Sequence, residues 1–394
     1  MVIELYDDVN TDALTFGVKM ALHDHPYFAT RLVKEGVMYY WDENDAEPVI
    51  EEIPILSAFN YGHCADHYFP FKVTYSGNNI CFNCSHELTD GSGLFIFIST
   101  VMEYYARYIH GDMNYIPEKT SREERLADEA ALPSEIAGRK DADPLGKIKN
   151  YTSSKFDPDR MSEEISCEKI TIDKAKLRST SFSFDASPFA LVSPVLSRAC
   201  LPYLTDDNRI VELSIPLSLR KIFNVESLHN FVGTNEFYYF DTIMKDMSYE
   251  QIATIFRARL DLLSDRDGIE EGWNKIVQMK PLLSTAEGRA KIMRGLFGGF
   301  YDANIVYTHI TQTNISDMAG EYIKSIYSMI YKMNPFITCV GVNFKNDVTL
   351  TISSKFSDDG FYKNICNELD KLDIHYTREK ITLGGMRFFE YDES

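Results

Sequence analysis

One short segment of this chain combines the residue types that proton transfer requires. Residues 85 to 93 read Ser-His-Glu-Leu-Thr-Asp-Gly-Ser-Gly. A histidine can take a proton from a hydroxyl, an amine or a thiol because its unperturbed pKa is about 6.5. Such a base typically contributes on the order of 10² to 10⁴ in rate. His86 is therefore the candidate general base, whereas Asp90 and Gly91 are expected to fix the loop by capping, ion pairing and backbone freedom.

The residues on either side predict the elements that position this segment. Residues 79 to 85 alternate as a strand does, so Ile80, Phe82 and His86 share one face. A helix is predicted from about residue 92 to 108, because apolar residues recur there at helical spacing. We therefore expect His86 at the end of a strand, on the face that looks toward the following helix or a partner domain.

Similar patterns extend over the rest of the chain. An amphipathic helix is predicted within residues 9 to 32, capped by Asn10 or Thr11 and ended by His25-Pro26. A charged stretch from residue 111 to 161 is interpreted as surface or linking material. Strands and helices then alternate to the end of the chain. This order predicts an α/β (α+β) fold with mixed sheets flanked by helices.

Composition and charge exclude several classes of protein. The chain has 394 residues, 44% of them hydrophobic, and a formal net charge of -19, which opposes nucleic acid as a partner. No apolar run approaches the roughly 20 residues of a membrane span, and no export signal is visible. Seven scattered cysteines favour a reducing compartment, so the predicted location is the cytoplasm. Cys81 and Cys84 have C-x-x-C spacing, but on a strand they face opposite ways, and no metal site is predicted.

Several motifs together resemble the chloramphenicol acetyltransferase superfamily of CoA-dependent acyltransferases, of the condensation-domain or alcohol O-acetyltransferase type. The segment with His86 and Asp90 is similar to the H-x-x-x-D-G motif of that family. Further resemblances follow in the same order along the chain, namely His25 to Leu32, Glu212 to Arg220, Asn230 to Gly233, Thr313 to Ser316, and the strand and helix within residues 348 to 372. Two features depart from the family pattern. Ser85 stands where many relatives have a first histidine, and Ser316 stands where a glycine is usual.

The resemblance implies a fold and a reaction. It implies two acyltransferase-like domains, residues 1–165 and 166–394, with His86 in a tunnel between them. Acyl-CoA, such as acetyl-CoA, is the implied cosubstrate rather than a bound cofactor. The implied partners are acyl-CoA and a small-molecule acceptor with a hydroxyl or an amine, or a carrier protein as the donor.

The family also implies roles for further residues. The motif aspartate of relatives pairs with an arginine, and Arg31 is the candidate partner of Asp90. Thr313 and Asn314 are candidates to bind the oxyanion of the tetrahedral intermediate. Four basic residues of the second half could meet CoA phosphates, although solvated surface is the commoner role for each of them: Arg220, Lys221, Lys291 and Arg294.

A second hypothesis comes from a different class of function. The chain could be a catalytically silent relative that binds a ligand or a partner in the same tunnel. Ser85 and the acidic net charge motivate this alternative. The acceptor, the acyl length and the oligomeric state stay open at the level of sequence.

Overall fold

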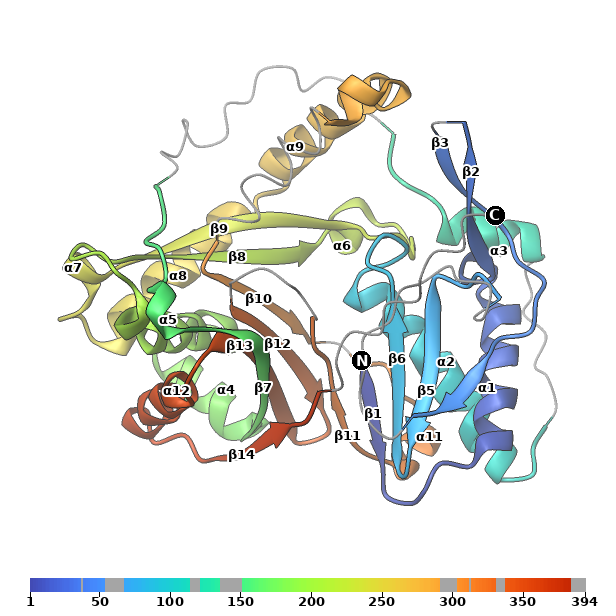
Figure 1. Ribbon diagram of the computed structural model, residues 1–394, viewed down its shortest axis with the longest axis horizontal. Helices are drawn as coiled ribbons and strands as arrows, with labels where there is room; N and C mark the ends of the chain where they lie inside the picture. Colours follow the sequence, from blue (N-terminus) through green and yellow to red (C-terminus); the bar gives the residue numbers. More distant parts are fainter. Residues whose placement is uncertain are drawn as a thin grey trace.

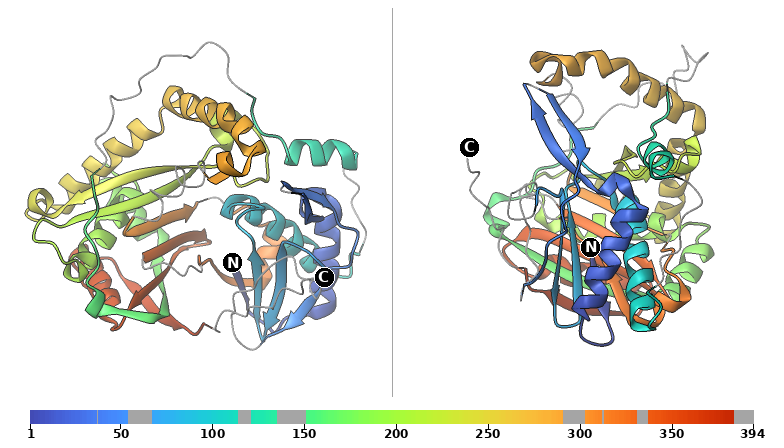
Figure 2. Two further views of the ribbon diagram at one scale, coloured as in Figure 1. Left: turned by 45° about the horizontal axis from the view of Figure 1, so that its top comes forward. Right: turned by 90° about the vertical axis from the view of Figure 1, so that its right-hand side faces the viewer.

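Two sheets of unequal size, each with helices packed on it, form most of the molecule (Figure 1). The computed structural model describes residues 1–36, 38–53, 67–113, 121–134, 151–290, 303–311, 313–330 and 337–383. The smaller sheet lies on the right of Figure 1 and the larger one on the left, and the left view of Figure 2 also shows them side by side. The predicted class, helices flanking mixed sheets, is confirmed.

The smaller sheet has five strands in the order β11-β1-β6-β5-β4. Its neighbouring strands are antiparallel except for the parallel pair β4 and β5. The strands are β1 (Val2–Leu5), β4 (Ile50–Glu52), β5 (Phe71–Ser76), β6 (Asn79–Cys84) and β11 (Ile323–Tyr327).

Helices α1 (Thr11–Asp24) and α2 (Gly91–Ile109) cover one face of this sheet. The predicted cap of α1 is confirmed, because the Asn10 side chain accepts a hydrogen bond from the Ala13 N–H at 2.9 Å. Gly17 permits close packing, since a Cβ at this position would lie 2.6 Å from the Val101 carbonyl oxygen in α2. The two helices and the sheet therefore share one hydrophobic core.

The larger sheet has seven strands in the order β14-β7-β13-β12-β10-β8-β9. Strand β10 is parallel to both of its neighbours, and the other pairs are antiparallel. The strands are β7 (Met161–Asp173), β8 (Ile210–Ser218), β9 (Val232–Phe240), β10 (Ile305–Ile310), β12 (Ile337–Phe344), β13 (Asp347–Phe356) and β14 (Tyr376–Ile381).

Four helices supply the partner layer of the larger sheet. Leu191, Phe256 and Leu369 from three of them are buried in one core with residues of β8, β10 and β13. Their apolar stripes match this burial, as amphipathic helices on a sheet require. The helices are α4 (Lys174–Ser183), α5 (Pro188–Cys200), α8 (Tyr249–Leu263) and α12 (Gly360–Lys371).

Smaller elements complete the part of the chain that the structure describes. Strands β2 (Thr30–Glu35) and β3 (Met38–Glu43) form a separate hairpin. The remaining α-helices are α3 (Arg122–Glu129), α6 (Arg220–Phe223), α7 (Asp241–Met244), α9 (Arg266–Met279) and α11 (Asp317–Tyr322). The 3-10 helices are η1 (Pro26–Phe28), η3 (Pro158–Arg160), η4 (Leu201–Tyr203) and η5 (Lys280–Ser284). No helix among these described residues is long and apolar enough to cross a membrane.

The two sheets are joined by residues that pass from one half of the sequence to the other. Strand β11 belongs to the second half but pairs with β1. Ile310, Val340 and Val342 of the larger sheet lie in the same core as α1 and α2. The predicted division between residues 165 and 166 falls inside β7, and as a boundary between domains it stays a prediction.

Candidate active site

His86 lies just beyond the end of β6, in a turn that leads toward α2. The strand ends at Cys84, the Ser85 N–H donates to the Pro70 carbonyl, and the Leu88 N–H closes the turn on the Ser85 carbonyl at 3.1 Å. Leu88 is fully buried, whereas the His86 side chain is exposed. The turn is therefore anchored by a buried residue while its imidazole stays accessible.

Asp90 caps the helix that follows this turn. Its Oδ1 accepts hydrogen bonds from the N–H groups of Ser92 and Gly93, at 2.9 and 3.0 Å. Two of the N–H groups that every helix start leaves without a partner are thus satisfied, and the negative charge lies at the positive end of the helix. This capping geometry is consistent with the predicted orienting role of Asp90.

The second oxygen of Asp90 reaches the other half of the molecule. Arg220 Nη1 donates to Asp90 Oδ2 at 2.8 Å, and the Phe231 N–H donates to the same oxygen at 2.9 Å. Arg220 also donates to the carbonyls of Ser227 and His229. Both charged side chains are buried, so this pair forms a desolvated link between the start of α2 and residues 220–231.

This arrangement corrects the predicted partner of Asp90. Arg31 lies in β2, directly opposite Asp42 of β3, and the two side chains form an exposed ion pair at 3.1 Å. Arg31 is exposed because it lies in a separate two-stranded hairpin whose side chains are mostly open to solvent. Arg220, at the end of the Glu212 to Arg220 motif, is the partner of Asp90. Its guanidinium is therefore not free to bind CoA phosphates.

Asn230 holds His86 directly. Its Nδ2 lies 2.9 Å from the His86 carbonyl oxygen and 3.1 Å from His86 Nδ1. Asn230 is adjacent to Phe231, whose N–H binds Asp90, so one short segment contacts both His86 and Asp90. The sequence did not predict this contact with His86, although Asn230 lies in one of the segments that resemble the family.

A buried polar network supports the loop from the side of the first helix. The Tyr27 hydroxyl donates to the Leu88 carbonyl at 2.7 Å and also lies 2.7 Å from His229 Nδ1. Glu129 binds the Tyr27 N–H with one oxygen and lies 2.6 Å from His25 Nδ1 with the other. Burial raises the pKa of Tyr27 and lowers the pKa of His229, so both groups are held neutral near pH 7.

Gly91 and Gly93 are needed for close contacts at the start of α2. A Cβ at Gly93 would lie 2.2 Å from Thr89 Oγ1 and 2.8 Å from the Leu228 carbonyl oxygen. A Cβ at Gly91 would lie 3.2 Å from Ile310 Cδ1, at the end of β10. The glycines therefore let the loop of His86 pack against the second half of the chain.

Thr313 and Asn314 lie in the loop that follows β10. The Thr313 hydroxyl donates to the Asn343 carbonyl at 2.7 Å, and Asn314 is exposed. In the described part of the chain, neither residue forms a hydrogen bond with His86. Their proposed oxyanion role stays a prediction.

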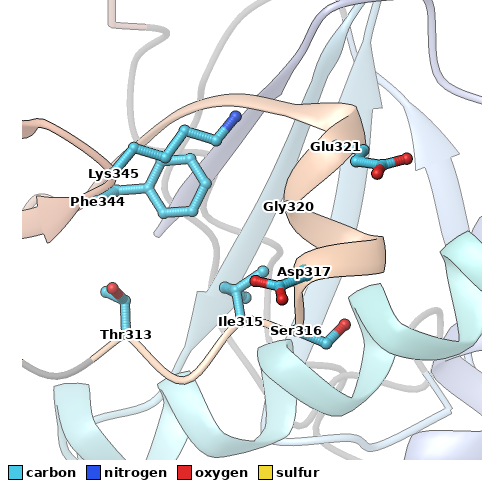
Figure 3. Close-up of a pocket in the computed structure, with 8 residues that line it drawn as sticks. All are labelled: Thr313, Ile315, Ser316, Asp317, Gly320, Glu321, Phe344 and Lys345. Carbon is cyan, nitrogen blue, oxygen red and sulfur yellow. The ribbon is translucent and has the colours of Figure 1, made fainter.

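Thr313 also lines an open cleft of about 410 Å³ between the end of β12 and α11 (Figure 3). Lys345 lies at one wall of this cleft, and its Nζ donates to the Ile323 carbonyl at 2.6 Å. His86 is not among the residues that line the cleft, which are Thr313, Ile315, Ser316, Asp317, Gly320, Glu321, Phe344 and Lys345.

The remaining predicted residues fall in different places. Lys221 is exposed, while Lys291 and Arg294 lie outside the described residues. Cys81 packs with Val2 and Tyr327, whereas Cys84 packs on the core under α2, so the two thiols face opposite ways as strand alternation predicted. Burial raises the pKa of Cys84 to about 12. In the described ranges, no group of three or more histidine, cysteine, aspartate or glutamate residues is arranged to hold a metal ion.

Solved structures share this fold, although no family model and no curated protein matches the sequence. Polyketide synthase associated protein 5 from Mycobacterium tuberculosis is 12% identical over 93% of this chain and 92% of its own, with a TM-score of 0.59. TRI101 from F. graminearum, complexed with coenzyme A and T-2 mycotoxin, is 13% identical over 95% of each chain, with a TM-score of 0.62.

A third similar structure is the epimerization domain from the third module of tyrocidine synthetase B. It is 11% identical over 94% of this chain and 90% of that one, with a TM-score of 0.56. These matches show that the chain shares its overall fold with these proteins, as the sequence motifs implied. At this level of identity the likeness concerns the fold.

Proposed function

We propose that this protein is an acyltransferase that moves an acyl group, such as acetyl, from a CoA thioester to a hydroxyl or amine acceptor, with His86 as the general base. One observation carries the proposal. The imidazole of His86 is exposed, yet the loop beneath it is fixed by the buried Asp90 and Arg220 pair and by Asn230. An accessible base on a rigid support is what proton abstraction at a bound acceptor requires.

The proposed reaction uses the exposed nitrogen of the ring. His86 Nε2 takes the proton from the acceptor as its oxygen or nitrogen attacks the thioester carbonyl carbon. The tetrahedral intermediate then collapses, the carbon–sulfur bond breaks, and His86 returns the proton to the departing CoA thiolate. Thr313 and Asn314 are the proposed donors to the oxyanion, and Thr313 would have to release the Asn343 carbonyl to serve.

Two lines of support come from the fold neighbours. TRI101 from F. graminearum and from F. sporotrichioides was crystallised with coenzyme A and T-2, and the former also with ethyl coenzyme A. Other neighbours are parts of nonribosomal peptide synthetases. A carrier-protein thioester is therefore the proposed alternative to CoA as the acyl donor.

The test is a thiol-release assay with acetyl-CoA and a panel of alcohols and amines. His86→Ala and His86→Gln should lower the rate on the order of 10² to 10⁴. His375, an exposed histidine that follows α12, provides the matched control, and His375→Gln should keep the activity of the natural protein. Transfer that survives in both His86 variants would refute the assignment of the base.

A second candidate is a catalytically silent protein that binds a ligand or a partner at the same place. Ser85 in place of the first histidine favours it, as does the assignment of Arg220 to Asp90 rather than to a CoA phosphate. Calorimetry with coenzyme A distinguishes the two. Binding that is unchanged in His86→Ala, with no turnover across the acceptor panel, supports this candidate.

A further inference from the structure

The side chain of Asn230 makes a contact that is directional. Its Nδ2 lies within hydrogen-bonding distance of two atoms of one residue, the carbonyl oxygen of His86 at 2.9 Å and the ring nitrogen Nδ1 at 3.1 Å. An amide nitrogen carries two hydrogens and accepts no hydrogen bond. The contact therefore specifies which partner donates.

The backbone carbonyl fixes which way the amide faces. If the amide of Asn230 were turned over, its oxygen would lie against the His86 carbonyl, and two acceptors would face each other. A carbonyl oxygen only accepts, so the NH₂ group must be the part that faces His86. The second hydrogen of that group then points at Nδ1, which must accept it with its lone pair.

We infer that Asn230 is a positioning residue that sets the tautomer of His86, so that the neutral imidazole carries its proton on Nε2. In a neutral imidazole one nitrogen is a donor and the other an acceptor, and which one holds the proton follows from the partner of the other. The Nε2 atom has no hydrogen-bond partner among the described residues, so it is the nitrogen offered to an acceptor molecule.

This inference has a consequence for catalysis that rests on the proposed function. A base that acts through Nε2 must have the lone pair on Nε2, and the proton on Nδ1. Before each transfer the proton must move from Nε2 to Nδ1, and the hydrogen bond from Asn230 to Nδ1 must be given up. Asn230 therefore keeps the free protein in the non-basic tautomer, and binding of the acceptor must displace its amide.

Asn230→Asp replaces the donor of this contact by an acceptor of similar size, and because its oxygens repel the His86 carbonyl, the carboxylate should turn away from that carbonyl and toward Nδ1. A carboxylate oxygen accepts from Nδ1–H, which leaves the lone pair on Nε2, and the nearby negative charge favours the protonated ring. Asn235→Asp is the matched control. Asn235 lies five residues further along the chain, in β9, and its substitution adds the same charge without the contacts that residue 230 makes with His86. It also makes no contact with Asp90 among the residues described.

The test is ¹⁵N NMR of protein labelled at histidine, with the His86 signals assigned by loss in His86→Gln. Above the pKa of the ring, the natural protein and Asn235→Asp should show Nε2 as the protonated nitrogen of His86. Asn230→Asp should show the proton on Nδ1, and its ring should titrate at higher pH. A natural protein with the proton on Nδ1 would overturn the inference, whether or not Asn230→Asp folds.

Activity adds an independent readout. If the proposed function holds, Asn230→Asp should raise kcat/KM about fivefold on the alkaline plateau, since one neutral hydrogen bond no longer has to be broken, and should move the acidic limb to higher pH. If Asn230→Asp changes neither the acidic limb of the pH profile of kcat/KM nor the protonated ring nitrogen of His86, the role of Asn230 is contradicted. Absence of turnover in every form contradicts the proposed function instead, and the NMR result still decides the tautomer.

Discussion

Asp90→Asn tests whether the ion pair beneath the candidate base is as desolvated as its geometry indicates. The substitution keeps the oxygen that caps α2 but removes the charge that faces Arg220 at 2.8 Å. Asp90 is 4% exposed and Arg220 is 9% exposed, so water cannot readily replace the lost partner. Removing one member of a buried pair costs about 3–5 kcal/mol, because the other charge is left buried without compensation.

The chain supplies its own control for this measurement. Arg31 and Asp42 form an ion pair of similar length, 3.1 Å, but both side chains are more than two-fifths exposed. Asp42→Asn should therefore lower the free energy of unfolding by less than about 1 kcal/mol. Urea unfolding of the natural protein and of both variants, followed by tryptophan fluorescence and circular dichroism, gives the two differences.

A double-mutant cycle then isolates the interaction itself. Arg220→Met alone leaves the buried charge of Asp90 without a partner. Asp90→Asn combined with Arg220→Met leaves neither charge of the ion pair. The double variant should cost at least about 2 kcal/mol less than the sum of the single variants. If Asp90→Asn costs no more than Asp42→Asn, the pair is solvated, and the argument that it anchors the loop of His86 fails.

Three further predictions follow from contacts near and away from the site. Gly93→Ala should lower the melting temperature by several degrees because its Cβ would lie 2.2 Å from Thr89 Oγ1, while Gly272→Ala in α9, with nothing near its Cβ, should not lower it in the same thermal scan. Cys84 is partly buried, and desolvation raises its pKa to about 12, so it should react with iodoacetamide at pH 8 more slowly in the native protein than in urea, and equal rates would contradict this desolvation. Burial lowers the pKa of His309 below its ordinary 6.5, so the unfolded chain binds more protons than the folded protein does as the pH falls below about 6.5. The contribution of His309 to stability is therefore fully present above about pH 6.5 and is lost as the pH falls through the lowered pKa. Urea unfolding from pH 7 to 5 should show that His309→Gln reduces the slope of the free energy of unfolding against pH by up to about 1.4 kcal/mol per pH unit.

Local signals in the sequence predicted much of the fold. The polar cap at Asn10, the Pro26 that ends α1 and the apolar spacing of α2 are all confirmed within a few residues. These features depend on interactions between residues close in sequence, and their periodicity shows which face is buried. Several elements were not predicted, among them β1, β9, β11, β14 and α4.

Two of the missed strands, β9 and β11, have physical reasons of their own. Strand β9 reads Val-Gly-Thr-Asn-Glu-Phe-Tyr-Tyr-Phe, with glycine and polar residues over its first half, and it lies at the edge of the larger sheet. An edge strand needs only one partner and tolerates exposed polar side chains, so its sequence alternates weakly. Strand β11 follows α11 without a turn signal, and its strand pairing is with β1, which lies more than 300 residues away in sequence.

Local sequence patterns do not determine which arginine pairs with Asp90. Arg31 and Arg220 both end a segment that resembles the family, and nothing in their local patterns distinguishes them as partners of Asp90. The choice is made by the fold, which buries Arg220 beside the cap of α2 and turns Arg31 into the hairpin. Periodicity predicts the face on which a side chain lies, but it carries no information about which distant segment will cover that face.

The candidate site depends on both halves of the chain. His86, Asp90 and the glycines of the motif come from one continuous segment, but their orientation is set by residues 220–231, which bind the ring, the cap and the helix start. A change that shifts this later segment would alter the ring of His86 without touching the motif. We therefore expect Ser227→Val, which removes the buried hydroxyl bonded to the His229 N–H and the Glu129 carbonyl, to broaden or shift the His86 NMR signals. His86 signals unchanged in Ser227→Val would contradict this coupling between the segment and His86.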